Sequence, residues 1–208
     1  MQNTFYVRAT HKFISEDLAD KELRVQLKQY GVDARRLSRF TQLSLLGVLA
    51  LKDKIEQNTS IYLGSGFSSP SKFDKMFHQL MQENVPSPLD FTANLHNAAT
   101  FQIAQNLGIQ GTSIFLAINQ HNCLQPLQLA LNDLLLDPNQ TALVGWAFEA
   151  ERQHRQEGSM WWLISRQKAD AIAEVTIDFT KHEENRPHFL QYFIELECRM
   201  SVEKKIIL

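Results

Sequence analysis

The sequence of 208 residues contains little cysteine. Its only two cysteines, Cys123 and Cys198, are too few for a disulfide framework. No Cys-x-x-Cys pair and no grouping of cysteine with histidine has the spacing of a zinc site. We therefore expect no bound metal. A chain of this length also needs no disulfide or metal to fold, because it can bury roughly 70% of its unfolded surface.

Neither an excess of one charge nor a long apolar run is present. The chain carries 21 basic and 23 acidic residues, a formal net charge of −2, which argues against nucleic-acid binding and against a polybasic membrane anchor. No apolar run approaches the roughly 20 residues of a membrane span. Residues 1–4 lack the basic and apolar regions of a signal peptide. The expectation is a soluble, cytoplasmic protein.

Glycine is also scarce, with 8 in the chain, and two of them flank Ser65. Gly64-Ser65-Gly66 lacks the Gly-Lys-Ser/Thr ending of a phosphate-binding loop and the third glycine of a dinucleotide-binding fingerprint. A tight turn with closely packed backbone is the simpler interpretation. We expect no nucleotide and no other cofactor.

Short apolar runs alternate with helical patterns over residues 5–146. This β-α-β order predicts a parallel sheet with helices on both faces. The run at 113–118 is apolar almost throughout, which predicts a central strand buried on both faces. The predicted strands are 5–9, 60–63, 113–118 and 142–146, and the predicted helices are 17–29, 37–51, 71–82, 91–107 and 121–136.

The pattern changes after Glu149. Residues 160–164 predict a strand in which Trp161 and Trp162 point in opposite directions, one into the core and the other against an interface. Residues 171–179 and 190–200 alternate between apolar and mostly polar side chains, which predicts an antiparallel pair of strands. We therefore interpret residues 1–208 as one α/β domain with a mixed sheet, and residues 150–208 as a C-terminal β-strand extension.

Residues 111–123 read as a buried strand that turns sharply into a helix. A turn at a helix N-terminus can stabilise a thiolate or an oxyanion. The turn residue here is Gln120, whose side chain can form hydrogen bonds but cannot attack a thioester. Cys123 follows inside the element and is interpreted as a small buried residue. Pro126 leaves two alternatives, a kinked helix from Gln120 or a helix that begins near Pro126 with Gln120 on a loop.

This segment resembles the nucleophile turn of β-ketoacyl synthases, in which Gly-Pro-Ser-Ile is followed by Thr-Ala-Cys. Gln120 stands where the family has its cysteine. Further family motifs follow the same order over roughly residues 33–178. The similar segments are Arg39-Phe40-Thr41-Gln42, Leu63-Gly64-Ser65-Gly66, Ser87-Pro88-Leu89, Asn97-Ala98-Ala99, Gly111-Thr112-Ser113-Ile114, Ala142-Leu143-Val144-Gly145 with Glu149, Glu157-Gly158-Ser159 and Ala173-Glu174-Val175. The resemblance implies the N-terminal half of a thiolase-like fold, with helices on both faces of a mixed sheet.

The sequence also departs from the family. Nothing after Val175 resembles the C-terminal half, which supplies two catalytic histidines. Glutamine at the nucleophile position occurs in chain-length factors, which are non-catalytic partners, and in decarboxylating ketosynthases. Because decarboxylation requires the histidines, the resemblance favours a chain-length-factor-like subunit in which Gln120 is a degenerate nucleophile. A malonyl-carrier decarboxylase and a non-enzymatic binding or scaffold module are the alternatives.

The chain is similar to truncated ketosynthase-like subunits of aryl polyene biosynthesis. This similarity implies a heterodimer with a full-length, cysteine-bearing ketosynthase, which elongates chains on an acyl carrier protein. In the family, the segment from Ser87 to Asn97 lies at the dimer interface. The residues implied for the acyl pocket or the interface are Leu89, Asp90, Phe91 and Asn97, with the first three as the wall that limits chain length.

Overall fold

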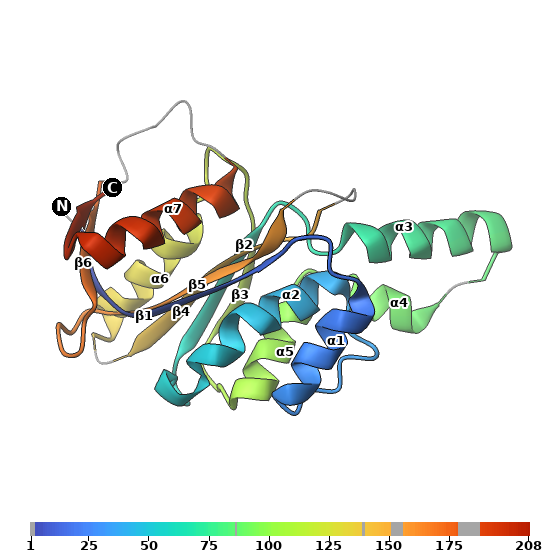
Figure 1. Cartoon of the computed structure of the whole chain (residues 1–208), viewed down its shortest axis with the longest axis horizontal. Coiled ribbons are helices and arrows are strands. Elements are labelled where there is room, and N and C mark those ends of the chain that lie inside the picture. Colours follow the sequence, from blue (N-terminus) through green and yellow to red (C-terminus); the bar gives the residue numbers. More distant parts are fainter. Residues whose placement is uncertain (1–2, 86, 139, 151–155, 179–187) are drawn as a thin grey trace.

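The computed structural model describes residues 3–85, 87–138, 140–150, 156–178 and 188–208. These residues form a seven-stranded sheet in the order β3-β2-β4-β5-β1-β6-β7 (Figure 1). β2 pairs in parallel with β3 and β4, whereas β4-β5, β5-β1 and β1-β6 are antiparallel. The predicted α/β class and mixed sheet are confirmed. The strands are β1 (Asn3–Ser15), β2 (Ser60–Ser65), β3 (Ser113–Ala117), β4 (Thr141–Phe148), β5 (Glu157–Ser165), β6 (Ala173–Ile177) and β7 (Lys205–Ile207).

Helices cover both faces of the sheet. One face carries α1 (Asp20–Gln29), α2 (Arg39–Val48) and α5 (Ala98–Leu107), and the other carries α6 (Gln125–Leu136) and α7 (Phe189–Val202). A 3-10 helix (Leu49–Lys54) follows α2. α3 (Pro70–His78), a π-helical turn (Gln79–Glu83) and α4 (Pro88–Ala93) extend away from the sheet (Figure 1). Among the described residues, none of the helices has both the length and the apolar content to cross a membrane.

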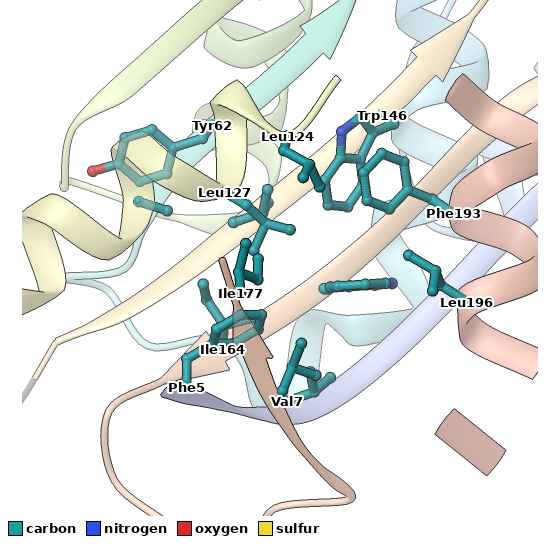
Figure 2. Packing of buried hydrophobic residues seen from close by; sticks show 14 of the residues in the cluster. Phe5, Val7, Tyr62, Leu124, Leu127, Trp146, Ile164, Ile177, Phe193 and Leu196 are labelled. Atoms are coloured by element: carbon teal, nitrogen blue, oxygen red, sulfur yellow. The ribbon is translucent and has the colours of Figure 1, made fainter. Parts of the chain in front are cut away.

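Two neighbouring tryptophans on β5 face the two separate cores. Trp161 packs in the core beneath α1, α2 and α5, and Trp162 packs in the core beneath α6 and α7. Their opposite orientation is confirmed. The expectation that one ring lies against an interface is wrong, because both rings are fully buried under helices of the same chain. In the α6–α7 core, Trp146 and Phe193 stack with ring centroids 3.5 Å apart (Figure 2).

Two glycines allow α2 to lie close to the sheet. A Cβ atom on Gly47 would lie 2.0 Å from Ser159 Oγ, and one on Gly145 would lie 2.3 Å from the ring of Trp161. Any side chain at either position would therefore push α2 or Trp161 outward. Trp161 also donates its Nε1 hydrogen to the Ser44 carbonyl at 3.1 Å, which fixes the ring beneath α2.

The C-terminal segment differs from the prediction. Residues 190–200 belong to helix α7 rather than to a strand, so the description of residues 150–208 as a β-strand extension is wrong for this part. The apolar positions fit a helix equally well, because Phe189, Phe193, Leu196 and Met200 recur every three to four residues and share one buried face. The strand predicted at 171–179 is present as β6, which pairs with β1 and, in parallel, with β7. Residue 179 lies outside the described residues.

The prediction of a central strand at 113–118 is also wrong. β3 is the last strand at one edge of the sheet, and the side chains of Ile114, Phe115 and Leu116 are only partly buried. A continuous apolar run identifies a strand but not its place in the sheet. The helix predicted at 91–107 is divided into α4 and α5. α4 ends at Ala93, and the side-chain amide of the following residue, Asn94, donates to the Asp90 carbonyl at 2.9 Å.

Candidate functional site

The turn that would hold a nucleophile in the related enzymes has no helix N-terminus behind it. α6 begins only at Gln125, with Pro126 in its first turn, so the second of the two alternatives is correct and Gln120 lies on a loop. The exposed side-chain amide of Gln120 lies 3.3 Å from His121 Nε2. The backbone N–H of His121 already donates to Asn119 Oδ1 at 2.8 Å. This donor is therefore not aimed at a reacting oxyanion.

Cys123 lies in the core beyond this turn. Its side chain is fully buried, as expected of a small structural residue. Its carbonyl accepts the Nε1 hydrogen of Trp146 at 2.8 Å, which ties the turn to β4. Cys123 is therefore a packing residue and does not present a sulfur at the surface.

A protruding arm, formed by α3, the π-helical turn and α4, lies beyond the end of β2 (Figure 1). α3 buries none of its residues, although Phe73 and Phe77 are apolar and lie four residues apart, on one face of the helix. Phe73 is 41% exposed and Phe77 is 53% exposed. Exposed apolar patches of this kind are typical of interaction sites. The arm therefore presents an apolar face that no described part of the chain covers.

A buried carboxylate, that of Glu149 at the end of β4, attaches the arm to the body. Glu149 is 2% exposed and accepts hydrogen bonds from the backbone N–H of Phe40 (2.8 Å), the hydroxyl of Ser69 (3.1 Å) and the backbone N–H of Ser71 (3.0 Å). These donors belong to the starts of α2 and α3, so one side chain links both helices to β4. Burial raises the pKa of Glu149 above its ordinary value, and the hydrogen bonds oppose this only in part.

Within the arm, Asp90 joins α4 to α3. Its carboxylate lies 3.1 Å from Lys72 Nζ and 3.2 Å from Lys75 Nζ. Burial by itself would raise the pKa of Asp90, but the hydrogen bonds from the two lysines outweigh it and hold the pKa below its ordinary value. Asp90 therefore has a clear structural contact, whereas its predicted place in the wall of an acyl pocket stays a prediction.

A row of aromatic rings, which we call the aromatic row, connects the core to the arm. It starts at Phe40, which is buried, and ends at Phe77 on the exposed face of α3. Successive ring centroids lie between 5.5 and 6.2 Å apart, a spacing typical of favourable aromatic pairs. The row passes the edge strand β3 on its way. In order, its members are Phe40, Phe115, His96, Phe67, Phe73 and Phe77.

A cavity of about 460 Å³ lies between the start of α2, α4 and α5. Two of the four predicted residues, Leu89 and Asn97, line this cavity, together with Leu95, Phe101 and Arg36. Asp90 and Phe91 are not among its lining residues, and Phe91 is 59% exposed on the arm. The volume is within the range of roughly 300–1,000 Å³ that small-molecule sites occupy. The structure thus brings Leu89 and Asn97 together at one mainly apolar cavity.

No protein-family model matches the sequence, and neither does any curated protein. Several solved structures share the fold. The chain aligns with the AntDE:AntF complex, a type II polyketide synthase ketosynthase with its acyl-carrier protein, at a TM-score of 0.61 and 14% identity over 80% of this chain. It aligns with the ketosynthase ApeO in complex with its chain length factor ApeC from Xenorhabdus doucetiae at a TM-score of 0.59 and 14% identity, again over 80% of this chain.

A third match is the ishigamide ketosynthase/chain length factor, with a TM-score of 0.57 and 18% identity over 71% of this chain. This chain spans 64%, 80% and 48% of the matched chains of the three structures, respectively. The fold is therefore that of ketosynthases and chain length factors, and the resemblance seen in the sequence motifs is confirmed at the level of the fold.

Sequence reasoning missed the open edge, the aromatic row and the exposed arm. Phe73, Phe77 and Leu80 recur every three to four residues, but such an apolar stripe has the same spacing whether it packs in a core or against another chain. The position of Pro126 was the one sequence signal that could have placed Gln120 on a loop, because proline is favoured in the first turn of a helix.

Proposed function

We propose that this chain is a non-catalytic, chain-length-factor-like subunit that pairs with an active β-ketoacyl synthase. In this proposal the pair elongates carrier-bound acyl chains in aryl polyene or fatty-acid-like biosynthesis in the cytoplasm. The observation that carries the proposal is the uncovered apolar surface that runs from the edge strand β3 along the arm. A chain that is otherwise well packed leaves this surface for a partner.

The edge strand supports pairing with another protein. β3 bonds on one side to β2, and its other side is the end of the sheet. An unpaired edge offers backbone donors and acceptors to a second chain, and proteins otherwise protect such edges with charge or proline. Ser113–Ala117 contains neither a charged residue nor a proline. The exposed apolar side chains Phe77, Phe91 and Phe101 add area to the same proposed interface.

Gln120 supports the non-catalytic part of the proposal. Condensation requires a thiolate at this turn, and Gln120 provides an amide on a loop that precedes α6 by several residues. The fully buried Cys123 cannot take its place without refolding of the turn. The partner ketosynthase would therefore supply both the nucleophile and the remaining catalytic groups.

The acyl chain would end in the cavity between α2, α4 and α5. Leu89 and Asn97 line this cavity, and Asp90 and Phe91 are neighbouring positions on α4 that we assign to its outer wall or to the interface. In the proposed complex the partner would close this cavity, and a chain that outgrows it would then force overpacking at a cost of about 1–3 kcal/mol. Such a cost would stop elongation at a defined length.

The proposal is tested by co-expression with a cysteine-bearing ketosynthase from the same organism. Light scattering should give a one-to-one complex, and chain extension should require both subunits. Leu89→Ala should give longer products from the complex, because Leu89 lines the cavity in which the acyl chain is proposed to end. Leu136→Ala is the matched control, because Leu136 is 86% exposed on α6, the helix under the other sheet face, and its loss should leave product length unchanged. If this chain formed no complex with any co-expressed ketosynthase, the proposed heterodimer would be contradicted.

A further inference from the structure

The cavity between the start of α2, α4 and α5 gathers exposed apolar side chains from separate parts of the chain. Leu89 on α4, Leu95 in the connection that follows it and Phe101 on α5 all line this cavity. All three side chains are exposed to solvent. Exposed apolar side chains that meet at a concave space are typical of a site for an apolar ligand.

The polar side chains at this cavity fall into two sets. The hydroxyls are used within the chain, because those of Ser38 and Thr41 lie 2.9 Å apart and that of Thr92 donates to the Leu89 carbonyl at 3.0 Å. The other set makes no side-chain hydrogen bond or ion pair within the described part of the chain, and each member offers N–H donors. This donor set consists of Arg36, Asn97 and Gln102.

The charge at the cavity comes from Arg36, which is the only charged side chain among the described lining residues. Its neighbour Arg35 binds Asp33 at 2.6 Å. The pKa of Asp33 is lowered to about 2, chiefly by hydrogen bonds from Arg35 and least by the charge of Arg36. Asp33 is thus engaged by Arg35, and the guanidinium of Arg36 is left for another anion. A guanidinium matches a carboxylate through two parallel hydrogen bonds.

We propose that this cavity binds a free carboxylic acid with an apolar chain. The chain lies against Leu89, Leu95 and Phe101, and the carboxylate lies on Arg36. An ionised carboxylate only accepts hydrogen bonds, which suits a cavity whose remaining polar groups are donors. A phosphate, with a charge of about −1.5 to −2 at pH 7, suits a single cation less well.

This inference goes beyond the proposed function, because it requires no partner and concerns a free acid rather than a carrier-bound chain. Both proposals use the same space, since the growing acyl chain would end in this cavity. A bound acid would therefore compete with the end of that chain and inhibit elongation.

The test of the charge uses the full chain, with octanoate as the probe and octanol as a neutral probe of equal chain length. We expect Arg36→Gln to bind octanoate at least about tenfold more weakly by calorimetry, because a charge-assisted pair of hydrogen bonds is lost. Its affinity for octanol should stay within about twofold. Arg36→Lys keeps the charge without the planar fork and should give an intermediate loss. Arg24→Gln is the matched control, since Arg24 does not line this cavity, and both affinities should stay within about twofold.

A second pair of variants tests the apolar wall. Phe101→Ala should weaken octanoate and octanol alike by about fivefold, because both chains lose the same apolar contact. Phe91→Ala is the matched aromatic control, since Phe91 is exposed on α4 but does not line the cavity, and it should change neither affinity by more than about twofold. Both side chains are exposed, so neither variant should lose its fold.

Three outcomes would overturn the inference: no saturable binding of octanoate, an octanoate affinity that Arg36→Gln leaves unchanged, or an equal loss in Arg24→Gln. If octanoate did not bind and Arg36→Gln weakened the heterodimer, the donors would receive a carboxylate of the partner, and the inference would again be wrong. If octanoate bound through Arg36 but no heterodimer formed, the acid site would stand and the proposed function would fail. A heterodimer that extends chains, with no octanoate binding, would give the opposite result.

Discussion

The molecule has two aromatic-rich regions, and they differ in whether the chain covers its own apolar surface. Beneath α6 and α7, the chain covers its own sheet, and Trp146, Trp162 and Phe193 are fully buried there. At the β3 edge, an equally aromatic region stays open, and Phe77 and Phe101 are more than half exposed. Composition does not distinguish the two regions. The difference lies in topology, since α7 covers the first region and no described part of the chain covers the second.

Half of a thiolase-like fold leaves a sheet face that either its own C-terminal segment or another chain can cover. α7 packs on that face and contacts β4 and β5. The proposed need for a partner therefore does not come from the sheet face. It comes from the edge strand and the arm, where the exposed aromatic side chains lie.

Phe193→Ala should have the largest effect on stability. Phe193 is fully buried against Trp146 and Trp162, and its truncation leaves a cavity that should lower the free energy of unfolding by about 3–5 kcal/mol. Phe77→Ala in the arm is the matched aromatic control, with an expected change within about 0.5 kcal/mol. Urea denaturation followed by tryptophan fluorescence measures both. Equal losses of unfolding free energy in the two variants would contradict the distinction between the covered core beneath α7 and the uncovered arm.

Glu149→Gln should have the next largest effect, because it weakens the link between the arm and the body. A glutamine offers one acceptor oxygen to the donors of Phe40, Ser69 and Ser71, so at least one stays unsatisfied at a cost of about 1–3 kcal/mol. Loss of the heterodimer with the sheet core intact would show that the link positions the arm. Near-ultraviolet circular dichroism and light scattering measure the two effects separately.

The stability of the wild type should depend on pH through Glu149, and the sign of this dependence follows from the direction of the pKa shift. Because burial raises the pKa of Glu149 above its ordinary 4.5, its contribution to stability is complete below that value and is lost as pH rises through the folded-state pKa. The free energy of unfolding of the wild type should therefore fall relative to Glu149→Gln as pH rises. If the difference in free energy of unfolding between the wild type and Glu149→Gln stayed constant as pH rises from 4.5, the raised pKa of Glu149 would be contradicted.

The sequence predicted where helices and strands occur better than it predicted which elements pack beside one another. Strands at 60–63 and 142–146 were found because β2 and β4 are buried on both faces and read as apolar runs. β3 has a similar run at the edge, and nothing in its own residues marks that position. Residues 189–200 satisfied both a strand and a helix pattern, and the helix was decided by the sheet face that it covers.

The candidate site was predicted only in part for the same reason. Leu89 and Asn97 came from a resemblance to family motifs, and the structure places both at one cavity. The cavity itself combines the start of α2 with α4 and α5, and the aromatic row joins α2, α3 and β3. Such contacts between elements follow from tertiary packing, which periodicity in a single sequence does not encode.

Asp90→Asn should have a smaller effect, confined to the open side. It removes the charge that Lys72 and Lys75 share, at an expected cost of about 1 kcal/mol, since the lysines are partly exposed. Because the pKa of Asp90 is lowered, its contribution is complete above the ordinary 3.8 and is lost as pH falls through the folded-state pKa. Denaturation curves should thus differ at neutral pH and converge in acid. The opposite trend would contradict the ion pair.

Gln120→Ala should have the smallest effect, because Gln120 lies on an exposed loop, and its one side-chain hydrogen bond within the described part of the chain is a weak contact of 3.3 Å with His121. The expected change in the free energy of unfolding is within about 0.5 kcal/mol. Chain extension by the heterodimer should be unchanged, and this chain alone should release no CO₂ from a malonyl-loaded carrier, with or without Gln120. Release that requires Gln120 would favour the decarboxylase alternative, and the turn before α6 would then be a catalytic site that the partner does not supply.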